Sequence, residues 1–256
     1  MFTAQQYVKA ASLEEAYELN QKKNNVILGG GCWLKMNRKN YHTVIDLSGL
    51  GLDTIEETPE EVVLGAMVTL RQMETSSLLK EYFGTGFLDM TRHIVGVQFR
   101  NCATLGGSLA SRFGFSDILT WLMGLGAQVE LFHGGRVSVE EYAAIPYDRD
   151  ILVRVYLPKD GRKAVYESVR NTQTDIPVLA CSVCLSGGML RAAIGARPGK
   201  AMMVPGEYPL SQEGIEQLIQ AAQKLEYGTN MRASAQYRRH LAQVLVRRAC
   251  GRIQEV

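Results

Sequence analysis

Hydrophobic positions in the first fifty residues follow two periods, which predict a small unit of strands and a helix. Residues 12–20 repeat apolar side chains at helical spacing, and Ser12 stands where it can cap the first turn. Residues 25–28 form a short apolar run, which predicts a buried strand that ends in three glycines. Residues 41–50 alternate apolar and polar positions and then turn. The expected order is therefore strand, helix, strand, loop, strand.

The pattern changes after residue 60, where strands and helices follow one another at short intervals. Residues 61–66 predict a strand, which leads to a helix that Thr69 can cap with Gln72 three residues on, as in a capping box. Residues 86–101 are amphipathic. The stretch 102–117 is rich in glycine and serine and is predicted to be a loop.

The rest of the chain predicts two domains. Residues 118–142 predict a helix and two strands, residues 150–158 predict a further strand, and the polar stretch 159–163 predicts a boundary. Beyond it, three strands with a glycine hairpin and two terminal helices are expected, at 164–170, 177–188, 189–196, 211–225 and 233–250. The pattern predicts an α+β protein with one domain at 1–160 and a small C-terminal domain of antiparallel sheet and helices at 161–256.

Composition and charge exclude several classes of function. The chain has 256 residues, 46% of them hydrophobic, and a formal net charge of +2, which is too small to indicate a nucleic-acid-binding protein. No run of about 18 apolar residues is present, so no membrane span is expected, and the first residues lack the pattern of a secretory signal. The five cysteines are odd in number and irregularly spaced, which predicts a reducing compartment, the cytoplasm.

Three glycines, Gly29–Gly31, follow the first buried strand and suit a phosphate group. Glycine lets a ligand approach the backbone, and consecutive N–H groups in such a turn form an anion-binding nest. A P-loop would need lysine and a hydroxyl residue where Cys32 and Trp33 stand, and a Rossmann fingerprint would need glycine in place of Leu34. Both motifs are absent from this loop, and the glycines taken alone are better explained as a tight turn.

A second glycine-rich segment, Thr104–Asp117, favours a ligand with two phosphates. Its pair Gly106–Gly107 can bring backbone donors to a phosphate, and its serine hydroxyls can bond phosphate or ribose. The Asp117 carboxylate can accept from ribose hydroxyls. Two nests far apart in sequence suit a ligand with two phosphates and two ends, and a dinucleotide is the simplest such ligand.

Several blocks of sequence together resemble the FAD-binding medium subunit of molybdenum hydroxylases, a family that includes bacterial xanthine, carbon monoxide and nicotinate dehydrogenases. The blocks are GGGCWL, GAMVTLRQME, QFRNCATLGGSLA, SDILTWLMGLGAQVEL and DILVRVYLP, and they stand in the family's order and spacing. The most specific part is residues 100–107 followed by Asp117, and the final predicted helix is similar to the family's C-terminal helix. The resemblance spans nearly the whole chain.

The resemblance implies a PCMH-type FAD-binding domain of two subdomains over residues 1–160. In the family, both glycine loops wrap the FAD pyrophosphate, and two strand positions lie near the flavin or adenine. His93 and Ile94 match the place where the family brings a helix end close to the isoalloxazine. No catalytic acid or base and no metal site is expected, because the redox chemistry belongs to the cofactor. Carried across residue by residue, the implied cofactor-binding residues are Ile27, Leu28, Gly29, Gly30, Gly31, Cys32, Trp33, Leu34, Ile94, Thr104, Gly106, Gly107, Ser108, Ser111, Ser116, Asp117, Ile151 and Leu152.

The same resemblance implies a role in electron transfer and two partner chains. Electrons would pass from a molybdopterin large subunit through an iron–sulfur small subunit to this flavin, and then to NAD⁺ or another acceptor. Two alternatives stay open. Cys32, Trp33 and Ser108 depart from the family's usual residues, which favours a flavin-poor scaffold subunit of the same complex. The other alternative is a stand-alone NAD(P)H-dependent flavin reductase.

Other residues that could carry chemistry are assigned to packing. Cys181 and Cys184 form a CxxC in a predicted strand, where they point to opposite faces, so buried free cysteines are expected rather than metal ligands. The four histidines are isolated in sequence and have no spacing for a metal. Trp121 stands in the most apolar segment and is expected in the core.

Overall fold

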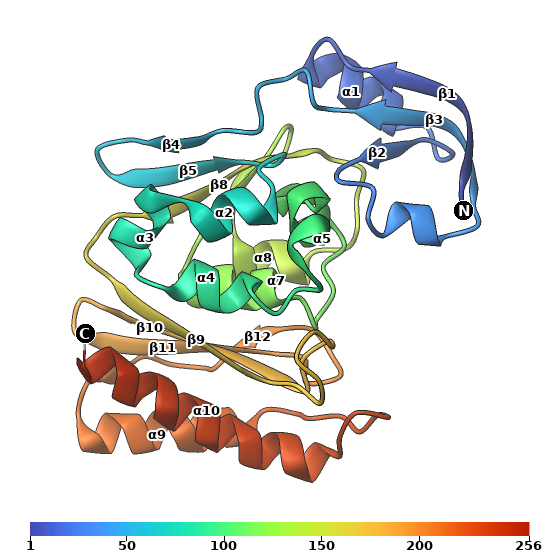
Figure 1. Cartoon of the computed structure of the whole chain (residues 1–256). Helices are drawn as coiled ribbons and strands as arrows, with labels where there is room; N and C mark the ends of the chain where they lie inside the picture. The colour runs from blue at the N-terminus through green and yellow to red at the C-terminus, as the bar shows by residue number, and fades with distance from the viewer. Residues whose placement is uncertain (256) are drawn as a thin grey trace.

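The computed structural model describes residues 1–255 and contains three sheets with helices packed between and around them (Figure 1). The N-terminal sheet is parallel, in the order β1-β3-β2, with β1 at Thr3–Lys9, β2 at Val26–Leu28 and β3 at Asn40–Asp46. Helix α1 (Leu13–Asn20) begins at Ser12, whose hydroxyl accepts from the Glu15 N–H. The predicted small unit of strands and a helix is confirmed.

A second sheet is antiparallel and is built from strands between residues 55 and 158. Its order is β4-β5-β8-β6-β7, so two strands predicted from sequence, β5 and β8, are neighbours although about ninety residues separate them. The sequence prediction missed β4, which is short and pairs only with β5. The bounds are Ile55–Glu57 for β4, Glu61–Gly65 for β5, Gln128–Leu131 for β6, Gly135–Ser138 for β7 and Leu152–Pro158 for β8.

Seven helices pack beside this sheet and enclose the largest core. Helix α2 begins with the predicted capping box, in which Thr69 and Gln72 bond each other's backbone. Trp121 on α7 is fully buried, as predicted, and its ring meets Phe87 edge-on at 5.6 Å between centroids. The bounds are α2 (Leu70–Thr75), α3 (Ser77–Phe83), α4 (Gly86–Thr91), α5 (Val97–Cys102), α6 (Leu105–Ala110), α7 (Asp117–Gly124) and α8 (Val139–Ala144).

The C-terminal sheet is antiparallel, with β12, β11, β10 and β9 side by side and β13 paired to β11. The predicted hairpin between β10 and β11 is confirmed, and the two predicted terminal helices form α9 and α10. The bounds are β9 (Lys163–Val169), β10 (Leu179–Ser186), β11 (Met189–Gly195), β12 (Met202–Met203), β13 (Tyr208–Pro209), α9 (Gln212–Lys224) and α10 (Ala235–Glu255).

This C-terminal sheet lies between two layers of helices (Figure 1). Leu179, Cys181 and Val183 of β10 pack in the core shared with α9 and α10, whereas Ala180 packs in the core shared with α4 and α7. The alternation of a strand therefore buries both faces. The C-terminal sheet shares a core with the helices that precede it, so the two predicted domains are not separated by packing. The domain boundary at residue 160 therefore remains a prediction.

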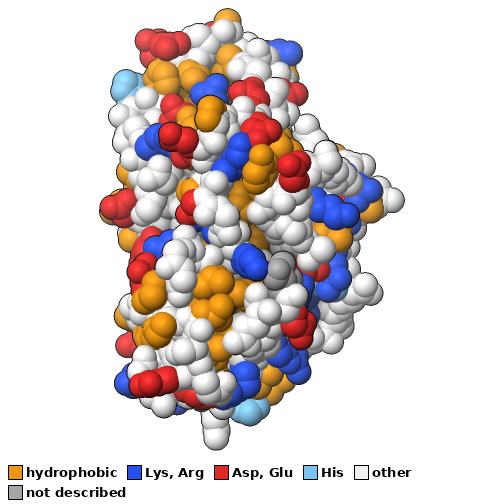
Figure 2. Space-filling view, turned by 90° about the vertical axis from the view of Figure 1, so that its left-hand side faces the viewer, with side chains coloured by type: hydrophobic (Ala, Val, Ile, Leu, Met, Phe, Trp, Pro, Cys, Tyr) orange, Lys and Arg blue, Asp and Glu red, His pale blue; other side chains and the backbone are white. Residues whose placement is uncertain are grey.

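Ion pairs link the last helix to the rest of the molecule. Arg252 on α10 pairs with Asp89 on α4 and with Glu167 on β9, each at 2.9 Å. Figure 2 shows acidic and basic side chains intermixed on one face, with hydrophobic side chains in small groups among them. None of the helices within residues 1–255 combines the length and the apolar character that a membrane crossing requires.

Candidate functional site

The first glycine loop begins where β2 ends and leads into a short 3₁₀ helix, η1 (Leu34–Met36). Gly30 packs against the end of α5, so closely that a Cβ there would lie 1.7 Å from the Cys102 carbonyl oxygen. Gly31 has a φ of +69°, which residues with a side chain rarely adopt. The backbone therefore requires both glycines, Gly30 for the close approach and Gly31 for the turn.

The same loop presents a row of unpaired backbone donors. Within residues 1–255, the N–H groups from Gly29 to Trp33 donate to no backbone or side-chain acceptor. The three glycines are half-buried and Trp33 is exposed, so these donors can reach water or a ligand at the surface of the loop. Consecutive free N–H groups in a glycine turn form a nest that binds an anion. The loop can therefore hold a phosphate group.

The second glycine-rich segment contains helix α6, so the loop predicted for residues 102–117 is wrong over 105–110. The Thr104 hydroxyl accepts from the Gly107 N–H at 3.2 Å, and the Ser108 hydroxyl donates to the Thr104 carbonyl at 2.8 Å. The prediction failed because both glycines lie in the first turn of α6, where a cap offsets their poor helix propensity.

The N–H groups of α6, unlike those of the first loop, are used inside the protein. Leu105 and Gly106 donate to the carbonyls of Val68 and Ala66, at 2.8 Å and 2.7 Å. The glycines of α6 instead permit close packing, because a Cβ on Gly106 would lie 2.9 Å from the Ala66 carbonyl oxygen. The first loop is therefore the anion nest, and the start of α6 packs against it at Gly29.

A cavity of about 260 Å³ lies beside the first loop and α6. It is bounded on one side by the turn at residues 93–95 and on another by the turn at residues 174–177, so both predicted domains contribute to it. The sequence-predicted residues that line it are Ile27, Gly29, Gly30, Gly31, Cys32, Trp33, Leu34, Ile94, Thr104, Gly107, Ser108, Ser111, Ser116 and Asp117.

Four predicted residues lie outside this lining. Ile151 is 1% exposed and packs in the core around the N-terminal sheet, and Leu152 packs in the central core. Gly106 faces Ala66, as described above, and Leu28 belongs to β2. The cofactor contacts predicted for Ile151 and Leu152 therefore remain proposals that the geometry of the cavity does not support.

The cavity also contains residues that were not among the predicted cofactor contacts. Phe113 and Phe115 follow α6 and could have been noticed as aromatic residues flanking a glycine. The segments after β9 carried no local signal, because single charged and apolar residues at the end of a strand are common. His93, which the resemblance placed near the isoalloxazine, lines the cavity as well. The added residues are Leu70, Val95, Phe99, Ala103, Phe113, Phe115, Ile118, Arg170, Thr174, Asp175, Ile176 and Pro177.

Three aromatic side chains form one wall of the cavity. Phe113 and Phe115 are stacked at 5.0 Å between ring centroids, and the Trp33 ring lies 5.8 Å from Phe113. Trp33 is 55% exposed and Phe113 is 42% exposed, although large apolar side chains are usually buried. Such exposed rings offer a surface on which a planar ligand can stack. This wall is the part of the lining best suited to an aromatic base.

Asp117 begins α7 and is almost completely buried at the cavity. Its Oδ1 accepts hydrogen bonds from the Tyr166 hydroxyl and from Nη2 of Arg170, both on or next to β9. Burial raises the pKa of Asp117 above its ordinary value, although Arg170 and Tyr166 oppose that change. The carboxylate therefore joins the two predicted domains.

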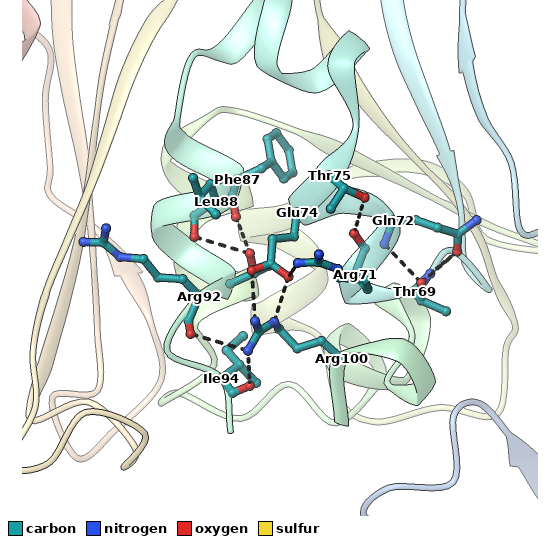
Figure 3. Close-up of polar contacts among 11 residues, drawn as sticks. Thr69, Arg71, Gln72, Glu74, Thr75, Phe87, Leu88, Arg92, Ile94 and Arg100 are labelled. Carbon is teal, nitrogen blue, oxygen red and sulfur yellow. Dashed lines mark hydrogen bonds and ion pairs between the residues drawn. The ribbon is translucent and has the colours of Figure 1, made fainter. Parts of the chain in front are cut away.

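A buried arginine, Arg100, fixes the turn at residues 93–95, which forms one side of the cavity. Figure 3 shows its polar contacts. Nε and Nη2 of Arg100 donate to the two carboxylate oxygens of Glu74, each at 2.9 Å, and Nη1 donates to the Ile94 carbonyl at 3.1 Å. Burial acts to raise the pKa of Glu74, but its hydrogen bonds to Arg100 and Arg71 outweigh burial and lower that pKa. The Arg100–Glu74 pair is therefore ionised and holds the turn.

Val95, at the end of this turn, has a strained backbone. Its φ is +52°, and a β-branched residue with positive φ is a genuine outlier. Strained residues persist where the surrounding structure holds them, and they cluster at functional sites. The cavity wall at residues 93–95 is therefore held by Arg100 in a shape that it would not adopt alone.

Cys32 does not offer a donor to the cavity in place of a hydroxyl. Its side chain is 8% exposed and its sulfur lies 3.6 Å from the Gly30 carbonyl oxygen and 3.9 Å from that of Phe99. Burial raises the pKa of the Cys32 thiol. The side chain packs beneath the loop, and the backbone of the loop faces the cavity.

Comparison with known proteins gives one family and one fold. A family model described as the FAD binding domain in molybdopterin dehydrogenase matches residues 2–160. The nicotine 6-hydroxylase medium subunit of Paenarthrobacter nicotinovorans is 29% identical over 268 residues, which cover 94% of this chain and 94% of that protein. The uncharacterized protein YgfM of Escherichia coli strain K12 is 27% identical over 254 residues, which cover 94% of this chain and 93% of that protein.

Among solved structures, the Cu,Mo-CO dehydrogenase in its cyanide-inactivated form matches with a TM-score of 0.86. The sequence identity is 24%, and the match covers 98% of both chains. At this identity the likeness shows a shared fold. It extends through the C-terminal sheet and helices, which the family model at residues 2–160 does not reach.

Proposed function

This chain belongs to the family of FAD-binding domains in molybdopterin dehydrogenase, and from that premise we propose that it is the electron-transferring flavin subunit of a multi-subunit molybdenum hydroxylase. The chain binds FAD and is an oxidoreductase subunit. The observation that carries the proposal is the row of free N–H groups from Gly29 to Trp33 beside a cavity with an aromatic wall.

The residues around the cavity fit FAD. The free N–H groups of the first loop would hold the pyrophosphate, and a Cβ on Gly30 would displace that loop from the Cys102 carbonyl. The wall of Trp33 and Phe113 would stack a planar ring. FAD supplies the redox chemistry when bound, and the chain binds and orients it. For that reason we assign no catalytic acid or base.

The proposed partners follow from the family. The relative from Paenarthrobacter nicotinovorans is by name a medium subunit, so it works beside other chains. We assign this chain an iron–sulfur small subunit as electron donor, a molybdopterin large subunit as the source of electrons, and NAD⁺ or another acceptor as the destination. All five cysteines are free, which supports a reducing compartment, the cytoplasm.

The identity of the flavin tests the proposed function. Protein purified from its native host and then denatured is expected to release FAD, because the loop donors suit a pyrophosphate that FMN lacks. Chromatography of the supernatant against FAD and FMN standards measures this. A colourless protein that also fails to bind added FAD would instead support the flavin-poor scaffold subunit.

Isolation of the complex tests the partners. An affinity tag on this chain, expressed in its native host, is expected to recover one small iron–sulfur chain and one large molybdopterin chain. The measurement is mass spectrometry of the recovered chains together with metal analysis for iron and molybdenum. The isolated chain should not oxidise NADH rapidly; rapid oxidation would support the stand-alone reductase.

A further inference from the structure

One corner of the cavity is formed by Arg170, which lies outside the part of the chain that the family model matches. Arg170 follows β9 directly, and its side chain is 7% exposed. Its Nη2 donates to Asp117 and its Nη1 donates to the Asp175 carbonyl oxygen at 2.6 Å. Its Nε is buried and, within residues 1–255, has no hydrogen-bond partner. A buried donor without an acceptor is destabilising, so this nitrogen indicates a missing partner.

Two other buried arginines of this chain, Arg100 and Arg238, have a partner for every nitrogen, whereas the Nε of Arg112, a residue outside the cavity lining, also lacks one within residues 1–255. Arg100 donates from all three nitrogens, to Glu74 and to the carbonyls of Arg92 and Ile94. Arg238 also donates from all three nitrogens, including Nε to the Val178 carbonyl at 2.9 Å. These two side chains have structural roles that use their donors fully. Arg170 combines an unpartnered Nε with a place in the cavity lining, and this combination indicates a residue that binds a ligand.

We propose that Arg170 binds the pyrimidine edge of the FAD isoalloxazine ring and that Asp117 positions the Arg170 guanidinium for this contact. This inference rests on the proposed function, since it needs FAD in the cavity. It adds a second role to the one first predicted for Asp117, because Oδ1 accepts from Arg170 and Tyr166 while Oδ2 accepts no hydrogen bond within residues 1–255.

The chemistry of the two ends of FAD assigns the isoalloxazine to this corner. Arginine has donors and no acceptor, so it suits the N1–C2 carbonyl side of the flavin pyrimidine ring, where the ring nitrogen and the carbonyl oxygen both accept. The N3–H donor of the flavin lies beyond that carbonyl, whereas the adenine edge carries an amino donor directly beside its ring nitrogens. The wall of Trp33, Phe113 and Phe115 lies in the same cavity and suits the adenine as a stacking surface.

The contact would act on the redox balance of the flavin. Two-electron reduction places negative charge on the pyrimidine side of the ring, and a guanidinium there favours the reduced form. Asp117 opposes that effect by neutralising part of the Arg170 charge. Removing the arginine and removing the carboxylate should therefore change the preference for reduced FAD in opposite directions.

The test compares binding of FAD, reduced FAD and ADP to the apoprotein of each variant. Arg170→Met is expected to weaken oxidised FAD about tenfold or more and to leave ADP unchanged, because ADP lacks the isoalloxazine ring. Arg191→Met is the matched control: Arg191 lies on the same sheet, pairs with Glu207 and does not line the cavity. It should leave all three affinities unchanged. FAD is followed by flavin fluorescence, ADP by calorimetry and the reduced form by anaerobic titration.

The ratio of oxidised to reduced dissociation constants gives the second readout. Arg170→Met should lower this ratio about tenfold, which corresponds to a potential about 30 mV lower for a two-electron couple. Asp117→Asn keeps the size of the side chain and should raise the ratio. A purely structural role would weaken both forms of FAD equally in both variants.

The outcomes separate this inference from the proposed function. If the wild type does not bind FAD, both are overturned. If the wild type binds FAD and Arg170→Met weakens ADP as much as FAD, Arg170 contacts the adenosine diphosphate and the inference alone is wrong. An unchanged ratio in both Arg170→Met and Asp117→Asn would also overturn it. Arg170→Lys covers the case in which Arg170→Met fails to fold. Because lysine keeps the charge, this variant should bind oxidised FAD more weakly than the wild type, and its ratio of oxidised to reduced dissociation constants should change less than that of Arg170→Met.

Discussion

Gly30→Ala is expected to abolish tight FAD binding while the rest of the fold forms. The added Cβ would lie 1.7 Å from the Cys102 carbonyl oxygen and 2.4 Å from its carbon, and these are backbone atoms that cannot turn away. The loop must therefore move off α5, and its row of free N–H groups moves with it. Hydrogen bonds to a charged group contribute about 1.5–3 kcal/mol each, so losing two of them weakens binding about 100-fold or more.

The measurement is a titration of apoprotein with FAD, followed by flavin fluorescence, beside a thermal unfolding curve. Gly51→Ala is the matched control, because Gly51 also has a left-handed φ of +65°, has no neighbour within 4 Å of its Cβ position and does not line the cavity. It should lose some stability and no FAD affinity. Gly29→Ala should lie between the two, since its Cβ meets the Thr104 Oγ1, which can rotate. Wild-type affinity in Gly30→Ala would show that the loop is not the pyrophosphate site.

The elements that were predicted correctly have local causes. Ser12 begins α1, and Thr69 with Gln72 begins α2, because a cap and its backbone partner lie within one helical turn. The hairpin at Gly187–Gly188 has both glycines at positive φ, as the turn requires. In each case the residues that determine the structure are adjacent in sequence, so the pattern alone was sufficient.

The first glycine loop was predicted as an anion nest because its glycines are adjacent in sequence. The same pattern led to the wrong prediction of a loop where α6 stands. Both segments contain consecutive glycines, but the N–H of Gly106 donates to the Ala66 carbonyl and that of Gly107 donates to the capping hydroxyl of Thr104. Whether glycine N–H groups face a ligand or the protein is decided by the segment that packs beside them, which for α6 is the turn after β5. That contact joins segments about forty residues apart, and the sequence pattern does not contain it.

The rest of the cavity depends on distant parts of the chain. Asp117 and Arg170 are 53 residues apart and come together because α7 packs on the C-terminal sheet. Ile151 shows the opposite case: it directly precedes β8, and its side chain packs with that of Val153 in the core of the N-terminal unit. A charged residue at the end of a strand gives no sign of its partner until the strand is placed.

Arg100→Met is expected to lower the free energy of unfolding by about 3 kcal/mol, the lower end of the cost of removing one member of a buried ion pair, because Arg71 still pairs with Glu74. Glu74 is 5% exposed on its side chain and would keep only Arg71 (Figure 3). The carbonyls of Arg92 and Ile94 would also lose the guanidinium that holds them. Urea unfolding measures the loss. Arg247→Met, which breaks the exposed pair with Glu216, is the control and should cost less than about 1 kcal/mol.

Arg100→Lys tests what the pair does for the cavity, because lysine keeps the charge but cannot reach Glu74 and both carbonyls in one plane. The turn at residues 93–95 should then relax from the strained φ of Val95, and FAD affinity should fall about tenfold. Val95→Gly removes that strain, which is about 1–2 kcal/mol for a residue in the left-handed region. Alone it should leave FAD affinity nearly unchanged, since Val95 is 56% exposed and the clamp already holds the turn.

Combined with Arg100→Lys, Val95→Gly should restore most of the lost affinity, because glycine adopts the left-handed conformation without being held there. The two substitutions would therefore be strongly non-additive in FAD binding, with a coupling of about 1 kcal/mol measured by a double-mutant cycle. If Arg100 merely stabilised the fold, Val95→Gly would change affinity equally in both backgrounds. Additive effects would show that the Arg100–Glu74 pair does not shape the cavity wall.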